Sequence, residues 1–181
     1  MKKVFLMMTA FCVMLSMLTS CGDDNAKKEE NVTKDTKIVK VEQNEIKMDG
    51  NQAKAILKKY VEDNNILVEP TESGLYYVKT QDGNGEKPAK GDIVMVHYTG
   101  KLLDGTVFDS SIERGEPIKF PIGVGYVIPG WEEGIMMLSK GEKGILYIPY
   151  DLAYGERGAG DAIPPFANLI FEVELVDFQA Q

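Results

Sequence analysis

Histidine and cysteine are scarce in this chain of 181 residues, which contains one histidine and two cysteines. Most zinc sites and disulfide scaffolds need several of these residues together, so most sites and scaffolds of these two kinds are excluded. Basic residues are also fewer than acidic ones: the chain has 20 Lys and Arg and 28 Asp and Glu, which gives a net charge of −8. No nucleic-acid partner is expected, since such an interface needs a basic face. Hydrophobic residues make up 44% of the chain, which is enough for one globular domain with a buried core.

Residues 1–20 have the pattern of a secretory signal peptide. Lys2 and Lys3 precede an almost wholly apolar run at residues 4–18, which is shorter than the about 20 residues of a membrane-spanning helix. The run ends in Leu18-Thr19-Ser20-Cys21, which resembles the lipobox of bacterial lipoproteins. This resemblance implies cleavage before Cys21 and a diacylglycerol on its thiol. The alternative is ordinary cleavage beside a cysteine that has no role.

Lipidation at Cys21 would make the membrane a partner of this protein. The other cysteine, Cys12, lies in the segment that is removed, so Cys21 is the only thiol left in an oxidising compartment. Acyl chains contribute about 0.8 kcal/mol per buried methylene and would anchor the protein in the cell envelope. Gly22 rather than Asp follows Cys21, so the usual inner-membrane retention signal is missing. An outer-membrane location, facing the periplasm or the surface, is therefore expected.

The mature chain begins with two short segments. Residues 21–49 are charged and polar, bury too little apolar surface to fold, and are predicted to form a flexible lipidated tether. Residues 50–66 are predicted to hold an accessory helix, because apolar side chains recur there every three or four residues: Ala53, Ile56, Leu57, Tyr60 and Val61. This apolar stripe either packs on the following domain or forms a dimer. We expect docking on the same chain, and a monomer.

The rest of the chain is strand-like and predicts an α+β fold. A leading strand at 74–80 is followed by a turn signal at 82–85. Residues 92–99 alternate, which places Val94, Val96 and Tyr98 on one face of a strand. Asp104-Gly105 marks a hairpin, and further strands are expected at 118–122, 144–148 and 169–178. Between them, Trp131, Ile135 and Leu138 share one face of a short helix.

Acid–base, metal and phosphoryl chemistry all find little support. His97 lies on a strand without a nucleophilic partner and is interpreted as a structural histidine. Gly123-Val124-Gly125 lacks the rest of a phosphate-binding loop, and Glu132 and Glu133 are interpreted as solvated charges. No cofactor and no metal are expected. Aromatic residues are abundant instead, and those not needed for the core are available to line an apolar pocket.

Five separated blocks of the sequence resemble the signature of the FKBP-type peptidyl-prolyl cis-trans isomerases. They are Val96-His97-Tyr98-Thr99-Gly100, Gly105-Thr106-Val107-Phe108-Asp109-Ser110-Ser111, Val127-Ile128-Pro129-Gly130-Trp131-Glu132-Glu133-Gly134, Ala153-Tyr154-Gly155 and Ile163-Pro164-Pro165. The resemblance implies an FKBP-like domain at residues 91–179, in which a half-open antiparallel β-sheet wraps around one short α-helix.

The resemblance also implies a pocket for a prolyl ring. The catalytic residues would be Tyr98, Phe108, Asp109 and Tyr154, and the substrate-binding residues Arg114, Phe120, Val127, Ile128, Trp131, Ile163 and Phe171. Trp131 would be the floor of the pocket, and Phe120 would pack behind its wall. The Tyr154 hydroxyl and the Ile163 amide would each bind a substrate carbonyl, while Asp109 would orient Tyr98 and pair with Arg114. The alternative for Trp131, Phe108 and Phe171 is plain core packing.

The family implies catalysis of Xaa-Pro isomerisation in proline-containing polypeptides outside the cytoplasm, and binding of macrolide immunosuppressant-type inhibitors. One alternative is a non-catalytic, chaperone-like module that binds polypeptides on the same fold. A second alternative is a structural envelope protein. Ile118 stands where many members carry an aromatic residue, which affects substrate preference more than catalysis.

Overall fold

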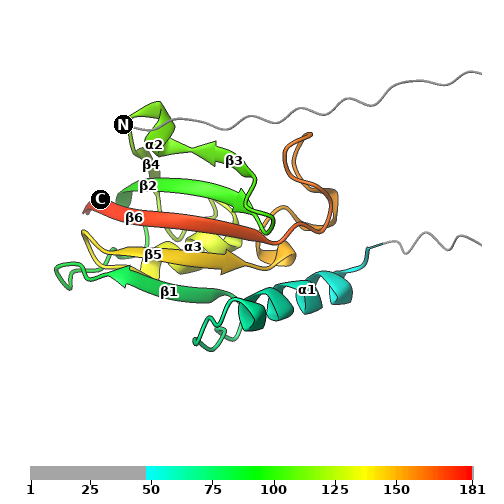
Figure 1. Ribbon diagram of the computed structural model, residues 1–181. Helices are drawn as coiled ribbons and strands as arrows, with labels where there is room; N and C mark the ends of the chain where they lie inside the picture. Colours follow the sequence, from blue (N-terminus) through cyan, green and yellow to red (C-terminus); the bar gives the residue numbers. More distant parts are fainter. Residues whose placement is uncertain (1–47, 181) are drawn as a thin grey trace, which may run out of the picture. The chain divides into compact units, whose positions relative to one another are not determined.

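The computed structural model describes residues 48–180 (Figure 1). The predicted signal peptide, Cys21 and almost all of the predicted tether lie outside the described residues. Among residues 48–180, no helix has both the length and the apolar composition needed to cross a membrane.

Six antiparallel strands form one sheet in the order β1-β5-β6-β2-β3, and β4 also pairs with β2. The strands are β1 (Tyr76–Gln81), β2 (Ile93–Leu102), β3 (Val107–Ser110), β4 (Ile118–Pro121), β5 (Lys143–Ile148) and β6 (Leu169–Gln179). The helices are α1 (Gly50–Asp63), α2 (Ser111–Arg114) and α3 (Pro129–Met137), and the short 3₁₀ helices are η1 (Tyr150–Leu152) and η2 (Gly155–Arg157). The predicted α+β fold, with an open antiparallel sheet and an N-terminal helix, is confirmed.

Strand β2 is the centre of the sheet and supports the residues of the later site. Its alternation is as predicted, with Val94, Val96 and Tyr98 buried on one face. One edge of β2 pairs with β6 along its whole length, and the other edge is shared by β4 and β3. The turn signal at 82–85 does not join neighbouring strands, because β1 pairs with β5 rather than with β2.

Helix α3 packs closely on one face of this sheet (Figure 1). Two glycines permit the contact: a Cβ at Gly130 would lie 2.4 Å from Cγ2 of Ile148, and a Cβ at Gly134 would lie 2.6 Å from Cδ1 of Leu146. Both partners belong to β5, so α3 approaches that strand along its glycine-bearing side. This contact positions Trp131, in the first turn of α3, over the centre of the sheet.

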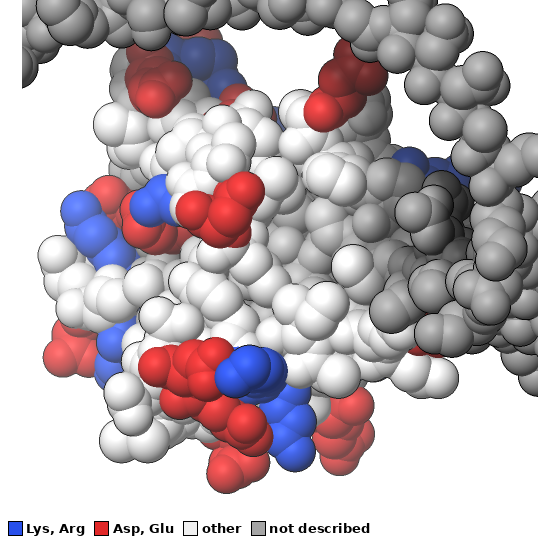
Figure 2. All heavy atoms as spheres, turned by 45° about the vertical axis from the view of Figure 1, so that its right-hand side comes forward, with Lys and Arg blue, Asp and Glu red and all other residues white. Residues whose placement is uncertain are grey.

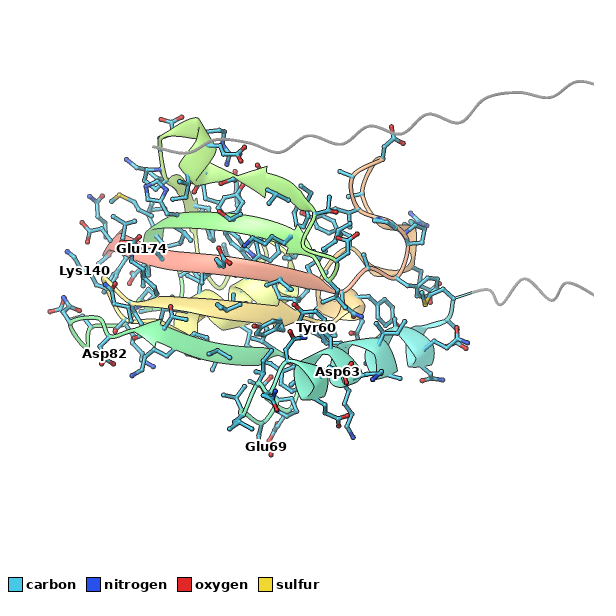
Figure 3. The ribbon with its side chains drawn as sticks, viewed as in Figure 1. Tyr60, Asp63, Glu69, Asp82, Lys140 and Glu174 are labelled. Carbon is cyan, nitrogen blue, oxygen red and sulfur yellow. The ribbon has the colours of Figure 1, made fainter. Side chains whose placement is uncertain are left out.

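Helix α1 begins with a capping box, in which Asp49 accepts the Gln52 N–H and the Gln52 side chain accepts the Asp49 N–H. Its buried face packs on Tyr147 of β5 and Ile170 of β6. Along each strand, these residues alternate with residues whose side chains point toward α3 on the other face of the sheet. Helix α1 therefore covers the opposite face of the sheet. Tyr60 lies on the same helix (Figure 3), with its ring 6.1 Å from that of Tyr147.

The apolar stripe of α1 is narrower than the sequence predicted. Ala53, Leu57 and Val61, spaced four residues apart, are buried, and Tyr60 is half-buried. Ile56 was expected to share this face but is 44% exposed. The reason is geometric: a helix that touches the sheet along a single i, i+4 row leaves the neighbouring row in solvent.

Candidate active site

A cavity of about 260 Å³ lies between α3, the strands β2, β3, β4 and β6, and the loops beside them. It brings together most of the predicted site residues, and its lining consists of Tyr98, Phe108, Asp109, Ile118, Val127, Ile128, Trp131, Tyr154 and Phe171. The predicted residues Arg114, Phe120 and Ile163 are not on this lining. Figure 2 turns the right-hand end of Figure 1 forward, and uncharged side chains occupy the middle of that face.

Trp131 forms the floor of the cavity and is 4% exposed. The ring of Tyr98 meets it edge-on at 5.0 Å, and that of Phe171 meets it edge-on at 5.1 Å. The ring of Phe120 lies 5.8 Å from that of Trp131 and is not on the lining, so Phe120 packs against the floor rather than behind a wall. Edge-to-face aromatic contacts of this kind are worth about 0.5–1.5 kcal/mol beyond area burial, so the floor is a rigid apolar surface.

The wall beside the floor depends on a glycine of the VHYTG block. Phe108 and Phe171 meet edge-on at 5.6 Å above β2. A Cβ at Gly100 would lie 2.7 Å from the Phe108 ring and 2.8 Å from the Phe171 ring. Any side chain at this position would push the two rings apart. The glycine of the motif is therefore explained by the close approach of these two aromatic rings.

A polar cluster borders the apolar floor. The Tyr98 hydroxyl donates a hydrogen bond to Asp109, the Arg114 guanidinium forms an ion pair with Asp109, and Arg114 Nη2 lies 2.8 Å from the Tyr98 hydroxyl. Burial raises the pKa of Tyr98, and its bond to Asp109 raises it further. Burial would also raise the pKa of Asp109, but the bonds from Tyr98 and Arg114 outweigh it and lower that pKa. At neutral pH the cluster consists of a phenol, a carboxylate and a guanidinium.

Tyr154 stands at the mouth of the cavity, between η1 and η2, and is 40% exposed. Partial burial, together with the charge of Asp109, raises the pKa of Tyr154, so its hydroxyl stays protonated. Within residues 48–180 no hydrogen bond to this hydroxyl contributes to that pKa shift, which arises from burial and the Asp109 charge alone. The hydroxyl is therefore available as a donor to a carbonyl that enters the cavity.

The Ile163 amide does not match the expectation that it would bind a substrate carbonyl. Its N–H donates to the Ala159 carbonyl at 3.1 Å, and the Ile163 carbonyl accepts the Ala159 N–H at 2.8 Å. This two-residue bridge closes the tip of the 155–166 loop, so the amide is already engaged. Ile163 is also buried.

The Ile128 amide is the backbone donor that sequence reasoning missed. Ile128 is the N-cap residue of α3 and lines the cavity, but the sequence suggested only a side-chain role for it. Its N–H has no hydrogen-bond acceptor in the described part of the chain. The signal was present in the sequence, because Pro129 marks the first helical position and the N–H groups there lack partners inside the helix.

Glu132 is a second residue whose role the sequence did not indicate. Its carboxylate accepts the Val127 N–H at 3.1 Å and also accepts the Gly123 N–H. The expectation of a solvated charge is wrong for Glu132, because both oxygens hold the loop that carries Val127 and Ile128. The neighbouring Glu133 accepts the Ser73 hydroxyl at 2.6 Å instead.

His97 lies on the face of β2 opposite to Tyr98, away from the cavity lining. Its Nδ1 is 3.0 Å from Oγ of the buried Ser111, and that oxygen also accepts the Tyr98 N–H at 2.7 Å. Across residues 48–180, no group of three or more His, Cys, Asp or Glu side chains is arranged to hold a metal ion.

Comparison with known proteins gives consistent matches. Residues 84–176 match the family described as FKBP-type peptidyl-prolyl cis-trans isomerase. The FKBP-type 22 kDa peptidyl-prolyl cis-trans isomerase of Escherichia coli is 56% identical over 121 residues, which is 66% of this chain and 58% of that protein. FK506-binding protein 2 of Yarrowia lipolytica is 64% identical over 91 residues, covering 50% of this chain and 63% of that protein. The chain thus spans less than two thirds of either relative.

Two solved structures are also similar to the chain. The crystal structure of FkpA from Escherichia coli matches with a TM-score of 0.64 and 42% identity, over 72% of this chain and 61% of that one. The crystal structure of AtFKBP13 matches with a TM-score of 0.59 and 41% identity, over 62% of this chain and 98% of that one.

Proposed function

The chain belongs to the FKBP-type peptidyl-prolyl cis-trans isomerase family, and from that premise we propose that it accelerates Xaa-Pro isomerisation in polypeptides bound at the Trp131 cavity. The observation that carries the proposal is the juxtaposition in this cavity of a rigid aromatic floor and unused hydrogen-bond donors at its edge. A prolyl ring is a compact apolar group, and a cavity of about 260 Å³ with these walls suits it.

Isomerisation breaks no covalent bond, so the site needs no nucleophile. The barrier of about 18–20 kcal/mol arises from amide resonance, which is lost when the C–N bond twists. The planar amide has a polar, well-hydrated carbonyl, and the twisted amide is less polar. Transfer from water to the apolar floor beside Trp131 therefore disfavours the planar state relative to the twisted one. Lowering the barrier by about 5 kcal/mol would accelerate exchange some thousandfold.

The donors at the edge would bind the substrate backbone. We assign one carbonyl to the Tyr154 hydroxyl and a second to the Ile128 N–H, because both are free within residues 48–180. The Ile163 amide is not assigned such a role, since it already bonds to Ala159. Asp109 and Arg114 act on Tyr98: their bonds to its hydroxyl hold the ring against Trp131.

The decisive experiment is catalysed cis–trans exchange of a short Xaa-Pro peptide, with the fluorescence of Trp131 recorded on the same samples. Trp131 is the only tryptophan of the chain, so its emission reports on the cavity floor. We expect faster exchange and a change in emission when the peptide binds. A change in emission without catalysed exchange would favour the alternative of a non-catalytic polypeptide-binding module.

Macrolide inhibitors provide a second test of the same cavity. One relative is named FK506-binding protein 2, and we propose that this chain binds FK506-type macrolides in place of the prolyl ring. The ligand should inhibit catalysed exchange and change the Trp131 emission. Binding that leaves catalysis unaffected would separate the macrolide site from the active site.

We further propose that the protein is a lipoprotein of the cell envelope, anchored through Cys21, that acts on clients outside the cytoplasm. The support is the sequence alone: a basic start, an apolar run and the Leu18-Thr19-Ser20-Cys21 block. Gly22 at the following position supports sorting to the outer membrane.

A further inference from the structure

Helix α1 comes before residues 84–176, the part of the chain that matches the family. It is nevertheless hydrogen-bonded, through one side chain, to the segment that leads into Tyr154. The link is the amide of Asn168, a residue that is 5% exposed. Its Nδ2 donates to the Ala53 carbonyl in α1 at 2.7 Å, and its Oδ1 accepts the Tyr150 N–H at the start of η1 at 3.0 Å. One buried side chain thus joins α1 to η1.

Two further contacts join the same elements. Lys54 of α1 forms an ion pair with Asp151 of η1 at 2.5 Å. Gly50, at the start of α1, lies so close to Tyr150 that a Cβ there would be 2.0 Å from the Tyr150 hydroxyl oxygen. The first turns of α1 are therefore linked to η1 in three ways: to its backbone through Asn168, to the Asp151 carboxylate, and to the Tyr150 ring.

Tyr150 in turn restrains both neighbours of Tyr154. The Tyr150 carbonyl accepts the Ala153 N–H at 3.1 Å. The Tyr150 ring lies 5.4 Å from that of Phe166, whose N–H donates to the Gly155 carbonyl at 3.1 Å. Tyr154 is therefore held on both sides by groups that depend on the position of Tyr150.

We propose that α1 is a positioning element for the active site, acting through Asn168 and Tyr150 to hold Tyr154 at the cavity mouth. This inference rests on the proposed function, because it assigns a role to Tyr154 in binding the substrate. Short 3₁₀ turns have poor hydrogen-bond geometry and little buried surface of their own. The 150–157 segment gains its order from outside, and α1 supplies part of it. Asn168 is the positioning residue.

The central test is Asn168→Asp in the full chain. The carboxylate keeps an acceptor for the Tyr150 N–H but replaces the donor to Ala53 with an oxygen that faces a carbonyl. Losing a buried hydrogen bond and adding this repulsion should loosen η1 and raise KM for an Xaa-Pro peptide about tenfold. A smaller change is expected in kcat. Unchanged KM in a folded Asn168→Asp variant would overturn the proposal.

A double-mutant cycle distinguishes positioning from general damage to the fold. Asn168→Asp is introduced into a Tyr154→Phe background, which lacks the hydroxyl that Asn168 is proposed to position. In this background the substitution should change KM less than twofold, because residues that act through one group are not additive. An equal effect in both backgrounds would overturn the proposal.

Milder variants keep the test valid if Asn168→Asp does not fold. Gly50→Ala inserts a methyl group against Tyr150, although Gly to Ala normally favours a helix. Lys54→Ala removes the ion pair to η1, and its matched control is Lys59→Ala, since Lys59 pairs with Asp63 inside α1. KM should rise in Gly50→Ala and Lys54→Ala but not in Lys59→Ala. An equal KM in all three variants and the parent would overturn the proposal.

Hydrogen–deuterium exchange of residues 150–154 provides a readout that does not need catalysis. Exchange should be faster in Asn168→Asp than in the parent, and unchanged exchange would contradict the link. If the parent catalyses no peptide exchange, the proposed function fails, and this measurement still decides whether α1 restrains η1.

Discussion

The Glu132 carboxylate accepts the Val127 N–H at 3.1 Å, so a residue of α3 holds the loop that enters the same helix. Its other oxygen accepts the Gly123 N–H. The Glu132 side chain is therefore hydrogen-bonded to both ends of the 123–127 loop. This loop places Val127 and Ile128 at the cavity wall. The charge also lies in the first turn of α3, where the helix dipole favours an anion.

We predict that Glu132→Gln weakens substrate binding more than the matched variant Glu133→Gln. A neutral amide turns an N–H toward one of the two backbone N–H groups, which should lower the free energy of unfolding by about 1–2 kcal/mol and raise KM. In Glu133→Gln the amide oxygen still accepts the Ser73 hydroxyl. Denaturant midpoints and catalysed peptide exchange provide the comparison, and equal KM values in the two variants would contradict it.

We predict that kcat/KM is nearly constant between about pH 5 and about pH 9. Asp109 has a lowered pKa and therefore remains ionised in this range, whereas Tyr98 and Tyr154 have raised pKa values and remain protonated. Below this range activity should fall, as protonation of Asp109 releases Tyr98 and Arg114. Any stability contributed by ionised Asp109 is lost in the same direction, as pH falls through its lowered pKa. A bell-shaped profile centred near neutral pH would contradict this account.

Local patterns predicted the parts of the fold that depend on neighbouring residues. The alternation of Val94, Val96 and Tyr98 predicted the buried face of β2, and the Asp104-Gly105 turn predicted the β2–β3 hairpin. Pairing of β1 with β5 could not be predicted, because the partners lie more than 60 residues apart and no periodic signal relates them. Ile56 was misplaced because the width of the helix contact depends on the sheet below it.

In the site, the sequence predicted which side chains come together better than it predicted the hydrogen bonds of the backbone. The aromatic residues of the motif blocks meet in one cavity, and the glycine between them is explained by the two rings it admits. For the backbone amides the sequence held one signal, Pro129 at the start of α3, and none for the loop that carries Ile163. Whether the Ile163 amide is free depends on the bridge to Ala159, and whether that of Ile128 is free depends on where α3 begins.

We predict that Cys21→Ala converts the protein into a form that no longer sediments with membranes. The thiol is the proposed site of acylation, and acyl chains would provide all of the membrane affinity. Cell fractionation with detection of the protein in pellet and supernatant is the measurement. Cys12→Ala is the matched control, because that residue lies in the segment proposed to be removed. A Cys21→Ala variant that pellets as completely as the parent would show that the anchor lies elsewhere.

We predict that the protein is a monomer at micromolar concentration. Ala53, Leu57 and Val61 are used against the sheet of the same chain, and Ile56 and Met48 are the large hydrophobic side chains that remain exposed at this helix. Two such side chains fall far short of the about 800 Å² that each partner buries in a stable interface. Sedimentation equilibrium tests this. A dimer that becomes monomeric in Ile56→Asp would overturn the prediction and favour pairing through α1.

Finally, Phe108→Ala should reduce turnover far more than it reduces stability. Phe108 lies on the cavity lining and is only half-buried, with its edge contact to Phe171 as its main aromatic support. Truncation of a fully buried Phe costs about 3–5 kcal/mol, so the loss in the free energy of unfolding should be smaller here. The loss of the wall beside the prolyl ring should nevertheless reduce kcat/KM by at least about tenfold, which corresponds to about 1.4 kcal/mol of transition-state binding.

The control for this variant is Val107→Ala, which truncates the exposed neighbour of Phe108 outside the cavity lining. Asp109→Ala should resemble Phe108→Ala, because it releases Tyr98 and Arg114 without opening the core. Each variant needs a denaturant midpoint and a catalysed exchange rate. Full activity in a folded Phe108→Ala protein would mean that the prolyl ring binds elsewhere. If Phe108→Ala instead loses as much stability as truncation of a buried Phe, Phe108 belongs to the core. The Asp109→Ala variant leaves the aromatic packing intact. Its catalysed exchange rate would then decide whether the polar cluster serves catalysis.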